Sequence, residues 1–139
     1  MAFKVFLDAG ILLDLTLKRE SYRAVRQLME WTVSGRIQAY VTPAVLQETG
    51  RRLKLAYGPD RAKELLQAIL AEVLVIDSGH SVAVSALHSA MADLDDALSY
   101  YAAMHHKLDY FITRNKELRA AAIPILPVCT PEVFLESNY

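Results

Sequence analysis

Short apolar runs alternate with segments of helical periodicity along this chain, and this alternation constrains its fold more than any other feature. The first run, residues 3–7, reads FKVFL and ends at Asp8. Short runs rich in β-branched or aromatic residues are typical of strands buried in a parallel sheet. We predict strands at residues 3–7, 37–41, 73–76, 109–113 and 124–128, and helices at residues 11–17, 21–34, 43–55, 61–71, 81–90 and 94–107, with a last short helix after Thr130.

Strands that alternate with helices in a chain of 139 residues predict an α/β fold. We expect a three-layer α/β/α sandwich around a mostly parallel sheet of about five strands, formed by a single domain over residues 1–139. The fifth strand is expected at an edge, because Pro124 and Pro127 lack the N–H that a central strand donates. The carboxyl ends of parallel strands share one rim, so polar residues that follow the strands can converge there.

Composition excludes several classes of protein. A formal net charge of −1 argues against a globally basic nucleic-acid coat or a membrane-surface protein, and leaves only a local basic patch such as Arg51, Arg52 and Lys54. The single cysteine, Cys129, excludes an internal disulfide and a cysteine-rich zinc cluster. No apolar stretch approaches the roughly 20 residues that span a bilayer. The chain enters a strand at once, so we expect no signal peptide, no membrane contact and a cytoplasmic location.

Acidic residues stand at the edges of several predicted elements. Asp8 ends the first strand, Glu48 lies on the helix after the second strand, and Asp93 and Asp96 have the spacing of the N-cap and third position of the helix at 94–107. Each also has a purely structural interpretation, as a helix cap or a solvated helix residue. Asp95 is expected to be solvated, off the face that carries Asp96.

The order of these segments resembles that of PIN domains, the nuclease family named after the PilT N-terminus. Residues 5–14, VFLDAGILLD, look like the family's opening motif, and Glu48 stands where the family places its second acid. The later matching segments are residues 93–98 (DLDDAL), 108–115 (LDYFITRN), 124–126 (PIL) and 130–135 (TPEVFL). The resemblance therefore covers nearly the whole chain.

A metal-dependent endoribonuclease is the activity that the resemblance implies. Carboxylate oxygens are the ligands that Mg²⁺ and Mn²⁺ prefer, and acids crowded at a sheet edge repel one another without a cation. A bound cation lowers the pKa of water and stabilises charge on a phosphate. In the site that the resemblance implies, Asp8, Glu48 and Asp96 hold the metal, and Asp93 and Asn115 complete the catalytic set.

Two positions depart from the family pattern. Gly10 stands where many members carry a polar residue, and Asn115 stands where many carry a fourth acid. Both departures weaken a second metal site, so one metal is expected. Thr113 and Arg114 are expected to contact the RNA substrate, and Asp14 is expected to be a structural acid that supports the site.

Partners and competing interpretations complete the prediction. The resemblance implies a VapC-like toxin with an antitoxin protein as its partner, and a composition of 53% hydrophobic residues favours a homodimer. The departures also fit a PIN-like module without catalysis, which binds RNA or assembles with proteins. Two enzyme or signalling classes with a similar fold fit the sequence less well. A phosphate receiver domain requires a lysine after the fifth strand, and this chain has none there. A haloacid-dehalogenase phosphatase requires an acid where this chain has Gly10.

Overall fold

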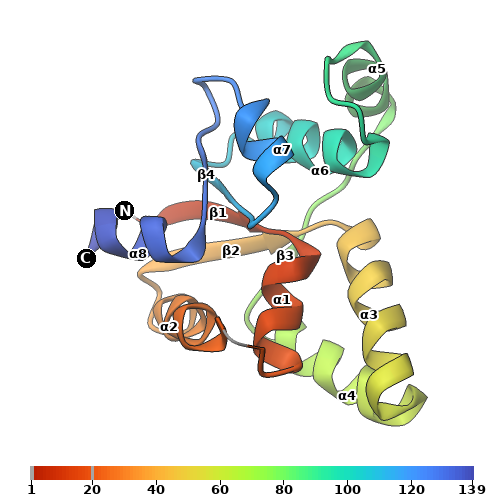
Figure 1. Ribbon diagram of the computed structural model, residues 1–139, viewed down its shortest axis with the longest axis vertical. Coiled ribbons are helices and arrows are strands. Elements are labelled where there is room, and N and C mark those ends of the chain that lie inside the picture. Colours follow the sequence, from red (N-terminus) through yellow and green to blue (C-terminus); the bar gives the residue numbers. More distant parts are fainter. Residues whose placement is uncertain (1, 20) are drawn as a thin grey trace.

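A computed structural model describes residues 2–19 and 21–139, in which strands and helices alternate along the chain (Figure 1). The strands are β1 (Phe3–Leu7), β2 (Ile37–Val41), β3 (Leu74–Val75), β4 (Tyr110–Ile112) and β5 (Val128–Cys129). The helices are α1 (Ala9–Thr16), α2 (Tyr22–Val33), α3 (Pro43–Tyr57), α4 (Pro59–Leu70), α5 (His80–His88), α6 (Leu94–His105), α7 (Lys116–Ala120) and α8 (Pro131–Asn138). None of these helices combines the length and apolarity that crossing a membrane requires.

The strands form one parallel sheet in the order β3-β2-β1-β4-β5. Helices α1 to α4 lie on one face of the sheet and α5 to α7 on the other (Figure 1), which confirms the predicted α/β/α layers. The chain leads from β1 to β2 on one side of the sheet and from β4 to β5 on the other side. A crevice therefore opens between the carboxyl ends of β1 and β4, which is where ligands bind in doubly wound sheets. Residues that follow β1 and β4 therefore meet at this crevice.

Local sequence signals explain where several helices begin. The Thr42 hydroxyl accepts a hydrogen bond from the Val45 N–H, and Pro43 occupies the first turn of α3. Thr130 caps α8 in the same way. Side-chain caps and a proline in the first turn both favour a helix start. Gly58 alone separates α3 from α4, and its φ of +86° is reached at little steric cost because glycine has no side chain.

Aromatic side chains pack at the centre of the sheet. Phe6 stacks on Phe111 of the neighbouring strand with ring centroids 4.6 Å apart, and both rings are fully buried. Tyr100 of α6 covers Phe111. Burying one such side chain stabilises the fold by roughly 1.5–3 kcal/mol. The ends of β1 and β4, which the site residues follow, are therefore held by buried aromatic packing.

The prediction of a fifth strand at residues 124–128 was wrong in its extent and correct in its edge position. Only Val128 and Cys129 pair with β4. The preceding residues form a loop because the buried Tyr100 hydroxyl accepts from the Ile123 N–H at 3.0 Å and donates to the Leu126 carbonyl at 2.6 Å. Helix α7 lies before this loop and was not predicted.

Candidate active site

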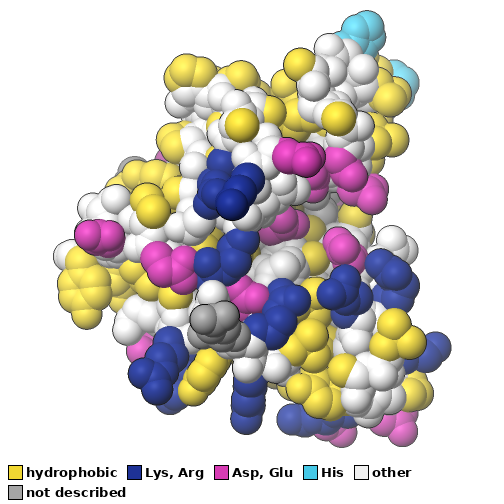
Figure 2. All heavy atoms as spheres, in the orientation of Figure 1, with side chains coloured by type: hydrophobic (Ala, Val, Ile, Leu, Met, Phe, Trp, Pro, Cys, Tyr) yellow, Lys and Arg dark blue, Asp and Glu magenta, His cyan; other side chains and the backbone are white. Residues whose placement is uncertain are grey.

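An open cleft of about 400 Å³ lies at the carboxyl edge of the sheet, between the end of β1 and the first turns of α3 and α6. Its lining residues are Asp8, Ala44, Val45, Gln47, Glu48, Arg51, Asp95, Asp96 and Ser99. Figure 2 shows acidic side chains gathered over this part of the molecule, with basic side chains beside them over α3. The three residues predicted as metal ligands, Asp8, Glu48 and Asp96, thus lie in one cleft although they come from distant parts of the chain.

Both carboxylate oxygens of Asp8 are held by hydrogen bonds. Oδ1 accepts from the Ala9 N–H at 2.8 Å, which makes Asp8 the N-cap of α1. Oδ2 accepts from the Thr113 hydroxyl at 2.7 Å. Capping and lining the cleft are therefore compatible roles for this residue. Thr113 is itself buried, so its hydroxyl orients Asp8 and does not line the cleft.

Asp96 lies half-buried in the first turn of α6, and its environment disfavours the charged form. Burial, followed by the carboxylates of Asp93 and Asp8, raises its pKa from the ordinary 3.8 to about 6. The Asn115 amide opposes this rise by donating from Nδ2 to Asp96 Oδ2 at 2.9 Å. Asp96 therefore experiences a like charge that comes from the end of β1, and a proton or a cation would relieve the repulsion.

Asn115 and Asp93 both act as helix caps. Asn115 Oδ1 accepts from the N–H groups of Glu117 and Leu118 and begins α7, so the atom that it turns toward Asp96 is its amide nitrogen. Asp93 accepts from the Asp96 N–H at 2.9 Å and begins α6. Neither residue lines the cleft, although Asn115 contacts the Asp96 carboxylate and Asp93 contacts the Asp96 backbone N–H.

Residues of the cleft that the motif match did not single out lie on the same two helices. Asp95 is exposed, as expected, but it lies on the cleft beside Asp96, contrary to the prediction that it points away. Its helical partner Ser99, four residues on, lines the cleft too, and this spacing was a signal that could have found both. Arg51 stands one turn after Glu48 on α3 and brings a positive charge to the rim.

Arg114 lies outside the cleft lining and contacts two acids. Its Nε donates to Asp14 Oδ2 at 2.7 Å, and its terminal nitrogens donate to the two oxygens of Glu132 at 2.6 and 2.8 Å. These contacts lower the pKa of Glu132 and raise that of Arg114. Asp14 is buried and also binds Arg19, as expected of a structural acid.

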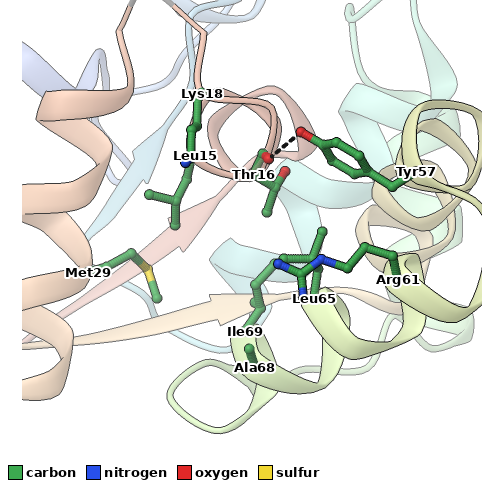
Figure 3. A pocket seen from close by; sticks show the side chains of 9 residues that line it. All are labelled: Leu15, Thr16, Lys18, Met29, Tyr57, Arg61, Leu65, Ala68 and Ile69. Carbon is green, nitrogen blue, oxygen red and sulfur yellow. Dashed lines mark hydrogen bonds between the residues drawn. The ribbon is translucent and has the colours of Figure 1, made fainter.

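A second hollow, of about 430 Å³, lies away from the acids between the end of α1, helix α2 and helix α4 (Figure 3). Its walls are largely apolar and include Leu15, Met29 and Leu65. Lys18 and Arg61 also line it, and the Tyr57 hydroxyl donates to the Thr16 carbonyl beside it at 3.2 Å.

The donors of the acidic cleft fit a hard divalent cation by their chemistry. In the part of the chain that the structure describes, no three His, Cys, Asp or Glu side chains stand close enough together to hold a metal ion. The Asp8 carboxylate is nevertheless near enough to raise the pKa of Asp96, and Glu48 is an exposed side chain on the same cleft. Oxygen donors with mutual repulsion are what Mg²⁺ or Mn²⁺ would stabilise.

The sheet order and the position of the cleft define a doubly wound α/β protein with an acidic site at its switch point. The family model described as the PIN domain matches residues 4–117, and the chain belongs to this family. Among curated protein sequences none matches this chain at a significant level.

Solved structures agree with the family in fold. The chain is similar to one in a toxin-antitoxin complex from Klebsiella pneumoniae, with 25% identity, a TM-score of 0.69, and 91% of this chain and 97% of that chain covered. It also resembles VapBC2 from Rickettsia felis bound to a promoter DNA fragment, with 14% identity, a TM-score of 0.71, and 92% and 98% covered. VapC20 from Mycobacterium tuberculosis, a toxin that cleaves the sarcin-ricin loop, gives 16% identity, a TM-score of 0.68, and 86% and 95% covered.

Proposed function

We propose that this PIN-domain protein is a metal-dependent endoribonuclease that hydrolyses phosphodiester bonds in RNA. The observation that carries the proposal is the convergence of Asp8, Glu48 and Asp96 in one cleft, where burial and then the neighbouring carboxylates of Asp93 and Asp8 raise the pKa of Asp96 to about 6. In this proposal these three acids hold Mg²⁺ or Mn²⁺, which would lower the pKa of a bound water and stabilise charge on the phosphate.

The remaining polar residues have supporting roles in this proposal. Thr113 and Asn115 orient Asp8 and Asp96 through the hydrogen bonds described above. Asp93 holds the first turn of α6, and so the backbone that carries Asp96. Arg51 lies at the rim, where a cation can neutralise a phosphate of the substrate.

Substitution of the acids tests this proposal. Asp8→Asn and Glu48→Gln should each abolish cleavage of RNA in the presence of Mn²⁺. Asp77→Asn is a matched control, because Asp77 also follows a strand but lies outside the cleft lining. If the cleft variants cleave RNA as fast as the control does, the proposed centre is wrong.

We further propose that the protein is the toxin of a toxin-antitoxin pair, acting in the cytoplasm, with a protein antitoxin as its partner. The relative from Klebsiella pneumoniae belongs to a toxin-antitoxin complex. The apolar hollow of Figure 3 offers a surface for an amphipathic segment of the antitoxin, and Lys18 and Arg61 favour acidic residues in it. Ala68→Arg should fill this hollow and weaken antitoxin binding, whereas the control Gln67→Arg, outside the lining, should not.

A second candidate function is a PIN-like module that binds RNA or assembles with proteins without cleaving RNA. One observation favours it: Asn115 turns an amide N–H toward Asp96 where a fourth acid would turn an oxygen. This candidate predicts RNA binding with no cleavage under any metal condition.

A further inference from the structure

We infer that Arg114 is a positioning residue, which fixes the orientation of Asp8 and Asp96 and does not bind the RNA. The inference rests on the proposed nuclease function and replaces the RNA contact that the sequence suggested for this residue. It assigns the ion pairs of Arg114 with Asp14 and Glu132 a role in the cleft that they do not line.

The two neighbours of Arg114 each hold one acid of the cleft. Thr113 donates its hydroxyl to Asp8 Oδ2 at 2.7 Å, and Asn115 donates its amide to Asp96 Oδ2 at 2.9 Å. The Asn115 N–H also donates to the Thr113 hydroxyl oxygen at 3.1 Å, so the two neighbours are linked. Any shift of the backbone at residues 113–115 therefore moves the hydrogen bonds of both acids together.

Arg114 anchors this segment through two acids that do not line the cleft. Nε binds the buried carboxylate of Asp14, and the two terminal nitrogens bind Glu132 in a bidentate pair. Bidentate contacts between arginine and carboxylates restrict geometry more than a single hydrogen bond does. The segment that orients the acids is thereby fastened to α1 through Asp14 and to α8 through Glu132.

The anchor also acts on the helix that Asp8 caps. Asp8 precedes α1, Asp14 lies within α1, and Asp14 binds Arg19 as well as Arg114. Arg114 thus joins the strand end that orients Asp8 to the helix that begins at Asp8. Outer partners of this kind commonly change metal affinity or activity by about 10- to 100-fold when they are removed.

Glu132→Gln distinguishes a positioning role of Arg114 from an RNA contact, because the two roles predict changes in different quantities. If Arg114 binds RNA, removing the Glu132 charge frees the guanidinium and adds net positive charge, so the KM for RNA should fall. If Arg114 positions the acids, the same change loosens residues 113–115, so kcat should fall and Mn²⁺ should bind more weakly. Glu132 is half exposed, so this variant should fold.

The experiment is steady-state cleavage of RNA together with calorimetric titration of Mn²⁺, on wild type, Glu132→Gln and Arg114→Lys. Arg114→Lys keeps the charge and loses the planar fork that matches a carboxylate. We expect both variants to lower kcat and Mn²⁺ affinity by about tenfold, with KM and its salt dependence unchanged. Glu64→Gln is the matched control, since it breaks the exposed Arg61–Glu64 pair on α4 and should behave as wild type.

A fall in KM for Glu132→Gln, or unchanged kcat and Mn²⁺ affinity in both variants, would overturn the positioning role. A different result would overturn the nuclease proposal: wild-type protein would bind Mn²⁺ without cleaving RNA. In that case the Mn²⁺ affinities of the variants still decide whether Arg114 positions the acids. Wild type that binds no Mn²⁺ would overturn both proposals.

Discussion

Asp96 is the acid of the cleft on which burial and neighbouring charge act together. Its carboxylate is half-buried, and three other carboxylates, those of Asp93, Asp8 and Asp95, raise its pKa. The Asn115 amide offsets part of this effect. The charged form of Asp96 therefore lowers the stability of the metal-free folded protein, and a proton or a cation would relieve this effect.

Asp96→Asn should abolish cleavage and raise the stability of the metal-free protein at pH 7. A folded-state pKa of about 6 lies above the ordinary 3.8, so wild type gains stability as pH falls from about 6 toward 4, and the variant lacks this gain. Allowing for solvent screening of a half-exposed group, we expect about 1 kcal/mol at pH 7. Melting curves in chelator at pH 5 and pH 7 measure it. A variant that melts below wild type at pH 7 would show that Asp96 matters mainly through the helix dipole.

Asn115→Asp should change metal affinity and stability in opposite directions. The new carboxylate can still cap α7, but it replaces the N–H that Asp96 accepts with a repelling oxygen. The metal-free protein should lose on the order of 1.5–3 kcal/mol of unfolding free energy, the value of a hydrogen bond to a charged group. Mn²⁺ should bind more tightly because a fourth carboxylate joins the site. Calorimetry and melting in chelator, with Asn138→Asp as the control, test this, and no change in either would place Asn115 outside the centre.

Local patterns in the sequence pointed to residues that line the cleft, whereas side-chain contacts between distant residues left no local pattern. Asp8 was identifiable because it follows an apolar run directly. The ion pairs of Arg114 were not, because its partners Asp14 and Glu132 lie 100 and 18 residues away in the chain. Asp95 was misplaced because periodicity alone does not show which helix face meets α3.

Elements with strong caps and clear periodicity were predicted well, and short elements were not. β2 agrees with its predicted range, and α3 begins at the predicted proline after the Thr42 cap. α7 has only five residues, and it begins because the Asn115 side chain accepts from two N–H groups. Residues 124–127 have the composition of a strand, but a hydroxyl from α6 holds them as a loop, which no local pattern reveals.

Tyr100→Phe should destabilise the protein by about 1–3 kcal/mol, since it leaves the carbonyl of the fully buried Leu126 without the hydroxyl that donates to it. The ring itself stays in the core, so the loss reports the hydroxyl alone. Tyr101→Phe is the matched control, because the neighbouring ring is only half-buried. Urea unfolding of both variants measures the difference, and equal midpoints would mean that the loop does not depend on this hydroxyl.

The whole molecule exposes apolar side chains on several elements. Leu55, Leu74 and Leu87 are each more than half exposed, on α3, β3 and α5. Trp31 does not belong to this exposed set, because it is buried against Phe134 and Tyr139. We predict a homodimer, because a composition of 53% hydrophobic residues is high for a domain of this size and apolar side chains stay exposed. Light scattering over a range of concentrations should give twice the chain mass, and a monodisperse monomer at high concentration would contradict the prediction.

The dependence of RNA cleavage on a divalent cation tests the central claim most directly, because the claim is that the acids of one cleft act through a bound metal. The measurement is the cleavage rate of wild-type protein on mixed RNAs in excess chelator, and again after Mn²⁺ or Mg²⁺ is restored. We predict that the rate falls to background in chelator and returns in full with the metal. Undiminished cleavage in excess chelator would contradict the account.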